Sequence, residues 1–169
     1  ENLEFSMESG YEVLNVTDGQ LTFVGNGQLA VLTATDNATG ITYNIPIIPQ
    51  SQYEVGLITK SFTDSTITLQ LLNAYEDLQW CILWQDTKAT TEPTLTADEL
   101  TLTIEPAWSE SKGRSFIRVY AMGDGKRLND LLIPLENGKV VSNIAELTRH
   151  DDHAQVLYSL MIDRFHNGN

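Results

Sequence analysis

The stretch Thr66-Ile67-Thr68-Leu69-Gln70-Leu71 indicates how this chain folds. Its apolar residues alternate with threonine and glutamine, which is the pattern of a strand with one buried face and one solvated face. The same alternation returns at residues 100–104, through Leu100, Leu102 and Ile104, and again at residues 117–121. Repeated half-buried strands of this kind predict antiparallel sheets.

The run Leu78-Gln79-Trp80-Cys81-Ile82-Leu83-Trp84 is apolar almost throughout and predicts a central strand. Trp80, Ile82 and Trp84 would share one face, and Cys81 and Leu83 would share the other. The two indoles have two interpretations, a flat platform for sugar rings or ordinary core packing, and their apolar neighbours favour the core. Cys81 is the single cysteine of the chain, so it has no disulfide partner within it, and it is predicted to be a buried thiol.

Turn-forming residues separate these short strands, and amphipathic helix patterns are nearly absent. The predicted fold class is therefore all-β, an antiparallel immunoglobulin-like β-sandwich over residues 8–138, with helix in less than about a quarter of the chain. Residues 1–7, Glu-Asn-Leu-Glu-Phe-Ser-Met, resemble the remains of a protease-cleavage tag, and we expect them to lie outside this fold.

The charge of the chain narrows the classes of partner. Ten basic residues stand against 23 acidic ones, for a net charge of −13. Such a surface repels phosphate backbones and anionic lipids, so neither nucleic-acid binding nor membrane attachment by charge is expected. Membrane insertion is not expected either, because no apolar run is long enough to span a bilayer. A neutral ligand such as a sugar is compatible with this surface.

The character of the sequence changes after Gly138. Residues 139–154 are predicted to be a linker, and residues 155–169 open with a nearly continuous apolar run from Val156 to Ile162. Such a run is typical of a parallel strand that is buried on both faces. We therefore expect a second domain to begin at residue 155.

The residues that follow this run carry a family resemblance. Asp163-Arg164-Phe165 and then Asn167-Gly168-Asn169, placed directly after an apolar strand, resemble the first barrel strand of the α-amylase superfamily, glycoside hydrolase family 13. Residues 116–121 and 129–138 are similar to the closing strands of the immunoglobulin-like domain that precedes the barrel in neopullulanases and cyclomaltodextrinases. Residues 155–169 would then be the first strand of a truncated (β/α)8 barrel.

This resemblance implies a non-catalytic accessory domain of an α-glucan-degrading enzyme, because the family's catalytic Asp, Glu and Asp lie on later barrel strands. The domain would pack against the catalytic barrel of its own chain and aid substrate binding or dimerisation. The source would be a bacterium of the Bacteroidetes, with the enzyme secreted, periplasmic or associated with the outer membrane. No cofactor is expected in this chain. In several family members the turn after the first barrel strand contributes to a structural calcium site, which makes Asn167 and Asn169 candidate ligands in the intact enzyme.

Two other functions stay open. The chain could be an autonomous carbohydrate-binding module for starch or another α-glucan oligosaccharide, or a general adhesion or scaffold sandwich with an accidental resemblance. For the binding module, Trp108 is the first candidate for stacking on a sugar, because it lies between Pro106 and a polar run and is predicted to be exposed in a loop. Glu110 is the candidate hydrogen-bonding residue beside it.

Overall fold

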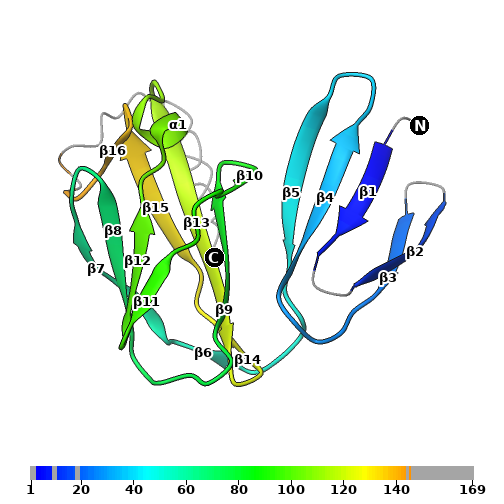
Figure 1. Ribbon diagram of the computed structural model, residues 1–169, viewed down its shortest axis with the longest axis horizontal. Helices are drawn as coiled ribbons and strands as arrows, with labels where there is room; N and C mark the ends of the chain where they lie inside the picture. Colours follow the sequence, from blue (N-terminus) through cyan, green and yellow to red (C-terminus); the bar gives the residue numbers. More distant parts are fainter. Residues whose placement is uncertain (1–2, 9–10, 18–19, 144, 146–169) are drawn as a thin grey trace, which may run out of the picture.

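The computed structural model describes residues 3–8, 11–17, 20–143 and 145, and strands dominate it (Figure 1). Within these residues the single helix is α1 (Pro106–Ser109), four residues long. This dominance of strands confirms the predicted all-β class. No helix in this described part is long and apolar enough to cross a membrane.

A four-stranded antiparallel sheet contains residues 66–71, the alternating stretch. Its order is β11-β12-β8-β7, with β7 (Leu57–Phe62), β8 (Thr66–Leu71), β11 (Thr94–Thr96) and β12 (Glu99–Thr103). Leu69 pairs with Leu100, and Ile67 pairs with Leu102. All four side chains are at most 2 % exposed, so the predicted alternation of buried and solvated residues is confirmed.

A seven-stranded sheet forms the second layer. Its main path is β10-β9-β13-β14-β6, and β15 and β16 continue from the side of β13. Its strands are β6 (Tyr53–Glu54), β9 (Gln79–Trp84), β10 (Thr87–Lys88), β13 (Arg114–Gly123), β14 (Lys126–Leu128), β15 (Leu131–Glu136) and β16 (Lys139–Val140). The short pair between β6 and β14 is parallel, unlike the other pairs in this sheet.

The two sheets share one apolar core, and we call residues 53–140 the two-sheet unit. Ile82, Val119 and Ile133 of the larger sheet belong to the same buried cluster as Ile67 and Leu69 of the smaller sheet. Burying a leucine or isoleucine completely contributes roughly 1.5–3 kcal/mol. This core is therefore the main source of stability for the two-sheet unit.

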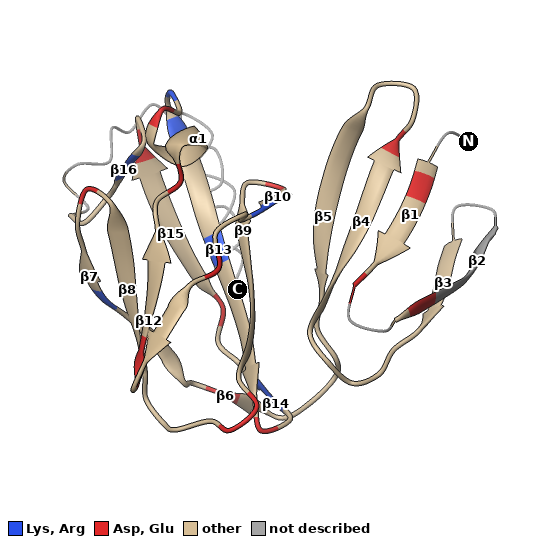
Figure 2. Cartoon of the chain, in the orientation of Figure 1, with Lys and Arg blue, Asp and Glu red and all other residues tan. Residues whose placement is uncertain are grey.

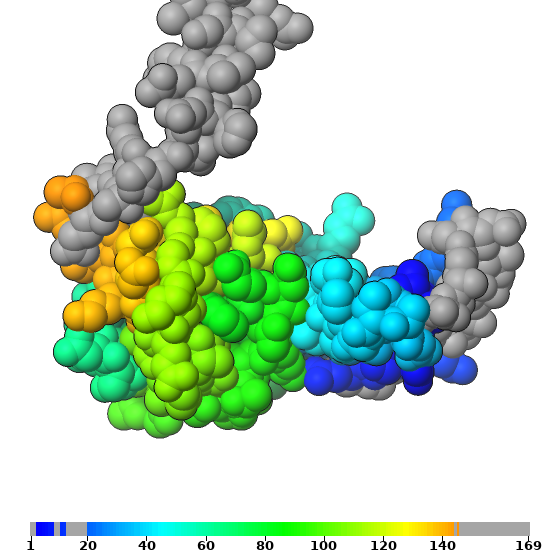
Figure 3. All heavy atoms as spheres, turned by 90° about the horizontal axis from the view of Figure 1, so that it is seen from above, coloured from blue at the N-terminus to red at the C-terminus, as the bar shows by residue number. Residues whose placement is uncertain are grey.

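The N-terminal strands form sheets of their own beside the two-sheet unit (Figures 1 and 3). One sheet has the order β1-β4-β5, from β1 (Leu3–Met7), β4 (Ala30–Asp36) and β5 (Ile41–Ile47), and β2 (Glu12–Thr17) pairs with β3 (Gln20–Val24). Leu29 and Val31 pack against Cys81, Leu83 and Met122 in a second buried cluster. Both faces of β9 are thus covered, which explains why its sequence is continuously apolar.

The N-terminal sheets divide the region that was predicted to be one sandwich. The region predicted as one sandwich, residues 8–138, contains the separate β4–β5 sheet as well as the two-sheet unit, because strand periodicity does not reveal which sheet a strand joins. Residues 3–7 were expected outside the fold, yet they form β1 and pair with residues 32–36 of β4. This pairing covers the edge of a strand whose Leu32 and Ala34 are buried.

The last described strand, β16, lies at the start of the predicted linker. Leu135 pairs with Val140, so residues 139 and 140 still belong to the larger sheet. The predicted barrel strand at residues 155–169 lies outside the described residues, together with Asn167 and Asn169.

The ring of Tyr75 lies directly over Gly123, the last residue of β13. A Cβ atom added at Gly123 would lie 2.5 Å from Cδ1 of Tyr75 and 2.8 Å from its Cβ, which is closer than carbon atoms approach. The last residue of β13 is therefore a glycine because the tyrosine ring occupies the space of a side chain.

We expect Gly123→Ala to lower the free energy of unfolding by about 1–3 kcal/mol, because the added methyl group must displace a partly buried ring. Urea denaturation measures this loss. The Gly123→Ala/Tyr75→Ala double variant should lose less stability than the sum of the losses in the two single variants, because the clash is absent once the ring is removed. Simple additivity would contradict the proposed contact.

Candidate functional site

The predicted sugar-stacking residue Trp108 lies in the core, and the expectation that it is exposed is wrong. It belongs to α1, its side chain is 3 % exposed, and it joins the apolar cluster between the two sheets. The polar residues around it suggested a loop, but the single turn of α1 turns the indole inward. Glu110 is the C-cap residue of α1 and is exposed. The two residues therefore do not form a stacking platform.

The turn that carries Trp108 is fixed by a buried carboxylate. Glu105 is 9 % exposed, and its Oε1 accepts hydrogen bonds from the backbone N–H of Thr90 at 2.6 Å and of Thr91 at 2.7 Å. The Thr90 hydroxyl donates to the same oxygen at 3.0 Å. Glu105 thereby ties the loop after β10 to the start of α1, and its contacts are those of a structural residue.

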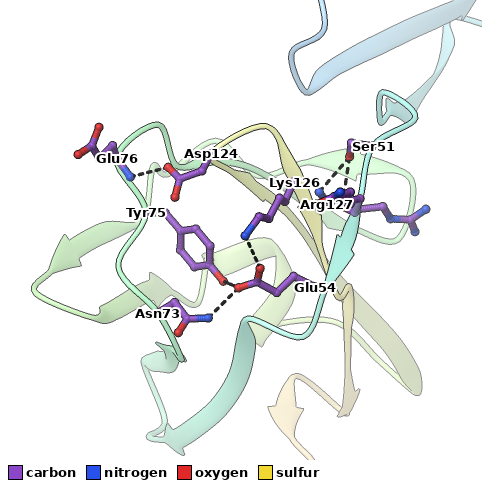
Figure 4. Close-up of polar contacts among 9 residues, drawn as sticks. Ser51, Glu54, Asn73, Tyr75, Glu76, Asp124, Lys126 and Arg127 are labelled. Atoms are coloured by element: carbon purple, nitrogen blue, oxygen red, sulfur yellow. Dashed lines mark hydrogen bonds and ion pairs between the residues drawn. The ribbon is translucent and has the colours of Figure 1, made fainter.

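Glu54 is the centre of the densest polar network (Figure 4). Its Oε1 accepts hydrogen bonds from Asn73 at 2.7 Å and from the Tyr75 hydroxyl at 2.9 Å, and its Oε2 accepts one from Lys126 at 2.8 Å. The hydrogen bond from Lys126, followed by those from Tyr75 and Asn73, lowers the pKa of Glu54. The same pairing raises the pKa of Lys126.

Because three donors already hold Glu54, this network is structural. It joins β6, the loop after β8 and β14, which are distant in sequence. Two further contacts extend it: Asp124 accepts from the backbone N–H of Glu76 at 2.9 Å, and Ser51 accepts from that of Arg127 at 3.0 Å. The network fixes the position of residues 73–76, which approach the groove described below.

The single thiol is buried and weakly acidic. Cys81 is 2 % exposed, and burial raises its pKa to about 11, so the thiolate is scarce at neutral pH. Among the described residues no group of three or more His, Cys, Asp or Glu side chains could hold a metal ion.

Two neighbouring hollows lie at the start of β9, where the N-terminal strands meet the two-sheet unit, and we call them the junction groove. The first has a volume of about 550 Å³ and is lined by Asn26, Glu76 and Asp77, among others. It shares Gln28 and Gln79 with the second, of about 250 Å³. A separate hollow of about 40 Å³ lies on the inter-sheet face of β9, where Ile82, Ala89 and Glu92 line it together with Trp80 and Lys88.

Several contacts fix the walls of the junction groove. The Leu29 backbone N–H donates to Oε1 of Gln79 at 2.8 Å. On the inter-sheet face of β9, the Trp80 indole N–H donates to Oε2 of Glu92 at 3.1 Å. The hydroxyl of Tyr11 donates to the Gln28 carbonyl oxygen and so anchors the loop before β4. Lys88 pairs with Glu8 at 2.7 Å, which bridges the two parts of the protein.

The junction groove combines side-chain amides and carboxylates, which is a surface for hydrogen bonding. Trp80 was predicted to be a core residue or part of a sugar platform, with the core favoured, and the structure shows the core contact. Its ring packs against the core between the sheets, and it also lines two hollows. Gln28 and Gln79 gave no signal in the sequence, because they meet through tertiary contacts.

Trp84, the second indole of β9, is partly buried and packs against the same core, and its N–H donates to the Ser115 hydroxyl at 3.1 Å. The core interpretation of this residue is therefore confirmed.

We expect Trp108→Ala to lower the free energy of unfolding by about 3–5 kcal/mol, since it leaves a large cavity in the shared core. Glu110→Ala is the matched control two residues away and should change this free energy by less than about 0.5 kcal/mol. Thermal or urea unfolding followed by circular dichroism measures both. A Trp108→Ala protein as stable as the wild type would contradict the buried position of the indole.

The Glu54 network makes stability depend on pH. The pKa of folded Glu54 lies below its ordinary value of 4.5, so its contribution is fully present above that pH and is lost as the pH falls through the lowered pKa. The destabilisation caused by Glu54→Gln should therefore shrink between about pH 7 and about pH 3. Urea titrations at each pH measure it, and Glu110→Gln is the control. A pH-independent difference would contradict this role.

Comparison with known proteins supplies no relative for this chain. No family model, no curated protein and no solved structure matches it. A fold does not by itself determine a function, so the function has to be argued from the chemistry of the described residues and from sequence resemblance.

Proposed function

We propose that this chain is a non-catalytic N-terminal accessory region of an α-glucan-degrading glycoside hydrolase of the α-amylase family. The proposal is supported by the order in which two segments follow each other along the chain. An all-β unit closes with β16 at Val140, and the barrel-like segment with Asp163-Arg164-Phe165 and Asn167-Gly168-Asn169 follows it. An accessory sandwich followed by the first barrel strand is the arrangement that the family resemblance implies.

The pairing of β13 with β15 supports an immunoglobulin-like assignment for the two-sheet unit. These strands contain most of the two segments that resemble the closing strands of the accessory domain in neopullulanases and cyclomaltodextrinases. They pair antiparallel, with Ile117 opposite Ile133 and Ser115 opposite Leu135. Ile117, Ile133 and Leu135 are at most 2 % exposed, as the inner face of a sandwich requires.

The end of the two-sheet unit from which the chain continues has a surface that suits docking of the catalytic barrel. A hollow of about 550 Å³ lies there, with Phe62, Ile104 and Val140 as apolar lining and Asp64 and Lys139 at its charged rim. A following domain that filled this hollow would bury the apolar side chains and pair with the charges. Dimerisation, the calcium ligands Asn167 and Asn169, and the bacterial, extracytoplasmic location remain parts of the proposal.

We expect this chain to release no reducing sugar from starch, pullulan or cyclodextrin. Hydrolysis with retention needs two carboxyl groups about 5 Å apart, and the family places its catalytic acids on later barrel strands. A longer polypeptide that continues through the barrel is the matched control and should hydrolyse at least one of these substrates. Turnover that follows the short chain through purification, or an inactive long polypeptide that is correctly folded, would contradict the proposal.

A further inference from the structure

We propose that two copies of this chain associate through the apolar face of β5, with Tyr43 of one copy against the same residue of the other. The contact is an isologous interface in which two β1-β4-β5 sheets pack face to face about a two-fold axis. This inference goes beyond the proposed function, which names no surface for dimerisation, and it does not depend on the glycoside hydrolase assignment.

The alternation of β5 directs its apolar side chains to solvent. Ile41, Tyr43 and Ile45 are alternate residues of this strand, so they share one face, and each is between 45 % and 49 % exposed. We call these three residues the β5 stripe. On the other face, Asn44 donates from its backbone and side-chain nitrogens to the carbonyl oxygen of Asp86, at 3.0 Å and 3.1 Å. The polar residue of β5 therefore contacts the two-sheet unit, while its large apolar residues are open to a partner.

The β5 stripe lies beside apolar residues that are already buried. Tyr43 pairs with Ala34, and Ile45 pairs with Leu32. Both of these β4 residues are at most 8 % exposed. The same face of the sheet is thus buried at its central strand and open at β5, and an apolar surface placed on the stripe would extend this burial.

The outer edge of β5 is unsuited to the addition of a strand. The backbone N–H of Asn44 points away from β4 and already donates to Asp86. Pro46, two residues further along, has the same orientation and has no N–H to donate. A strand added at this edge would therefore find few free donors, which favours contact through the face of the sheet.

The β5 stripe is symmetric about Tyr43, with an isoleucine two residues away on each side. An isologous interface requires a self-complementary patch of this kind. A two-fold axis at Tyr43 places Ile41 of each copy against Ile45 of the other and brings the two tyrosine rings together at the centre.

Charge favours a second copy over a basic partner. Each chain carries a net charge of −13, so two copies repel each other through most of their surface. Residues 41–47 contain no charged side chain, and Figure 2 shows β5 without acidic or basic residues along its length. On the β4 and β5 strands of this face the single carboxylate is that of Asp36, which pairs with Ile41 at one end. Two acidic chains can meet here without bringing carboxylates together, whereas a basic partner would find little to pair with.

The size of the β5 stripe sets the expected affinity. Three large side chains, each about half exposed, offer roughly 300 Å² of apolar surface per copy, which is less than the roughly 800 Å² per partner of a standard interface. We therefore expect a weak dimer, with a dissociation constant between about 10 µM and about 1 mM. Salt screens the repulsion between the acidic copies, so association should strengthen severalfold between about 50 mM and about 500 mM NaCl.

Sedimentation equilibrium of the full chain tests this interface. Tyr43→Lys should weaken association at least about ten-fold, because two ammonium groups would meet at the axis. Tyr53→Lys is the matched control, since it makes the same change of charge at a tyrosine of β6 that is 62 % exposed, and it should associate as the wild type does. Circular dichroism checks that each variant is folded.

A mixture of two variants tests the two-fold axis. Tyr43→Glu should also weaken association on its own, but an equimolar mixture with Tyr43→Lys should restore it, because a carboxylate then faces an ammonium group. A mixture that stays monomeric, equal weakening by Tyr53→Lys, or a dimer that persists in Tyr43→Lys would each overturn the proposal. So would a wild-type chain that is still monomeric at about 1 mM in high salt. These results do not depend on hydrolysis, so the interface can fail while the accessory role survives.

Discussion

Burial of both faces of β9 is the constraint on which the rest of the structure depends. One face contributes Ile82 to the core between the two sheets, and the other contributes Cys81 and Leu83 to the cluster with Leu29 and Val31. A strand covered on both sides must be apolar along its length, which is the composition that residues 78–84 have. Without the N-terminal strands, one face of β9 would expose these side chains to water.

The same constraint creates the junction groove. Packing Leu29 and Val31 onto β9 brings the loop before β4 next to Gln79 and Trp80, and the hydrogen bond from Leu29 to Gln79 fixes this approach at 2.8 Å. The Lys88–Glu8 ion pair lies along the same junction, although an exposed pair of this kind contributes little stability. The groove is therefore a consequence of how the N-terminal strands attach to the two-sheet unit.

The two polar networks around Glu54 and Glu105 hold loops in place, whereas polar groups of the junction groove line a hollow. Glu54 and Glu105 each accept three hydrogen bonds from described residues, which fits groups that hold loops in place. Gln79, by contrast, uses only its oxygen, and Trp80 combines a core contact with two hollow walls. This contrast separates the structural polar residues from those that line a hollow.

The sequence by itself determined the all-β class, the two faces of the alternating strands, the buried thiol of Cys81 and the core position of Trp84. Each of these depends on period-two alternation or on local composition, which are properties of neighbouring residues. The tertiary structure alone decided three other matters: that residues 3–7 pair with β4, that Trp108 turns into the core, and that residues 26–28 meet residues 76–80. The physical reason is that these outcomes depend on contacts between segments far apart along the chain, and local periodicity carries no information about which distant surface covers a strand.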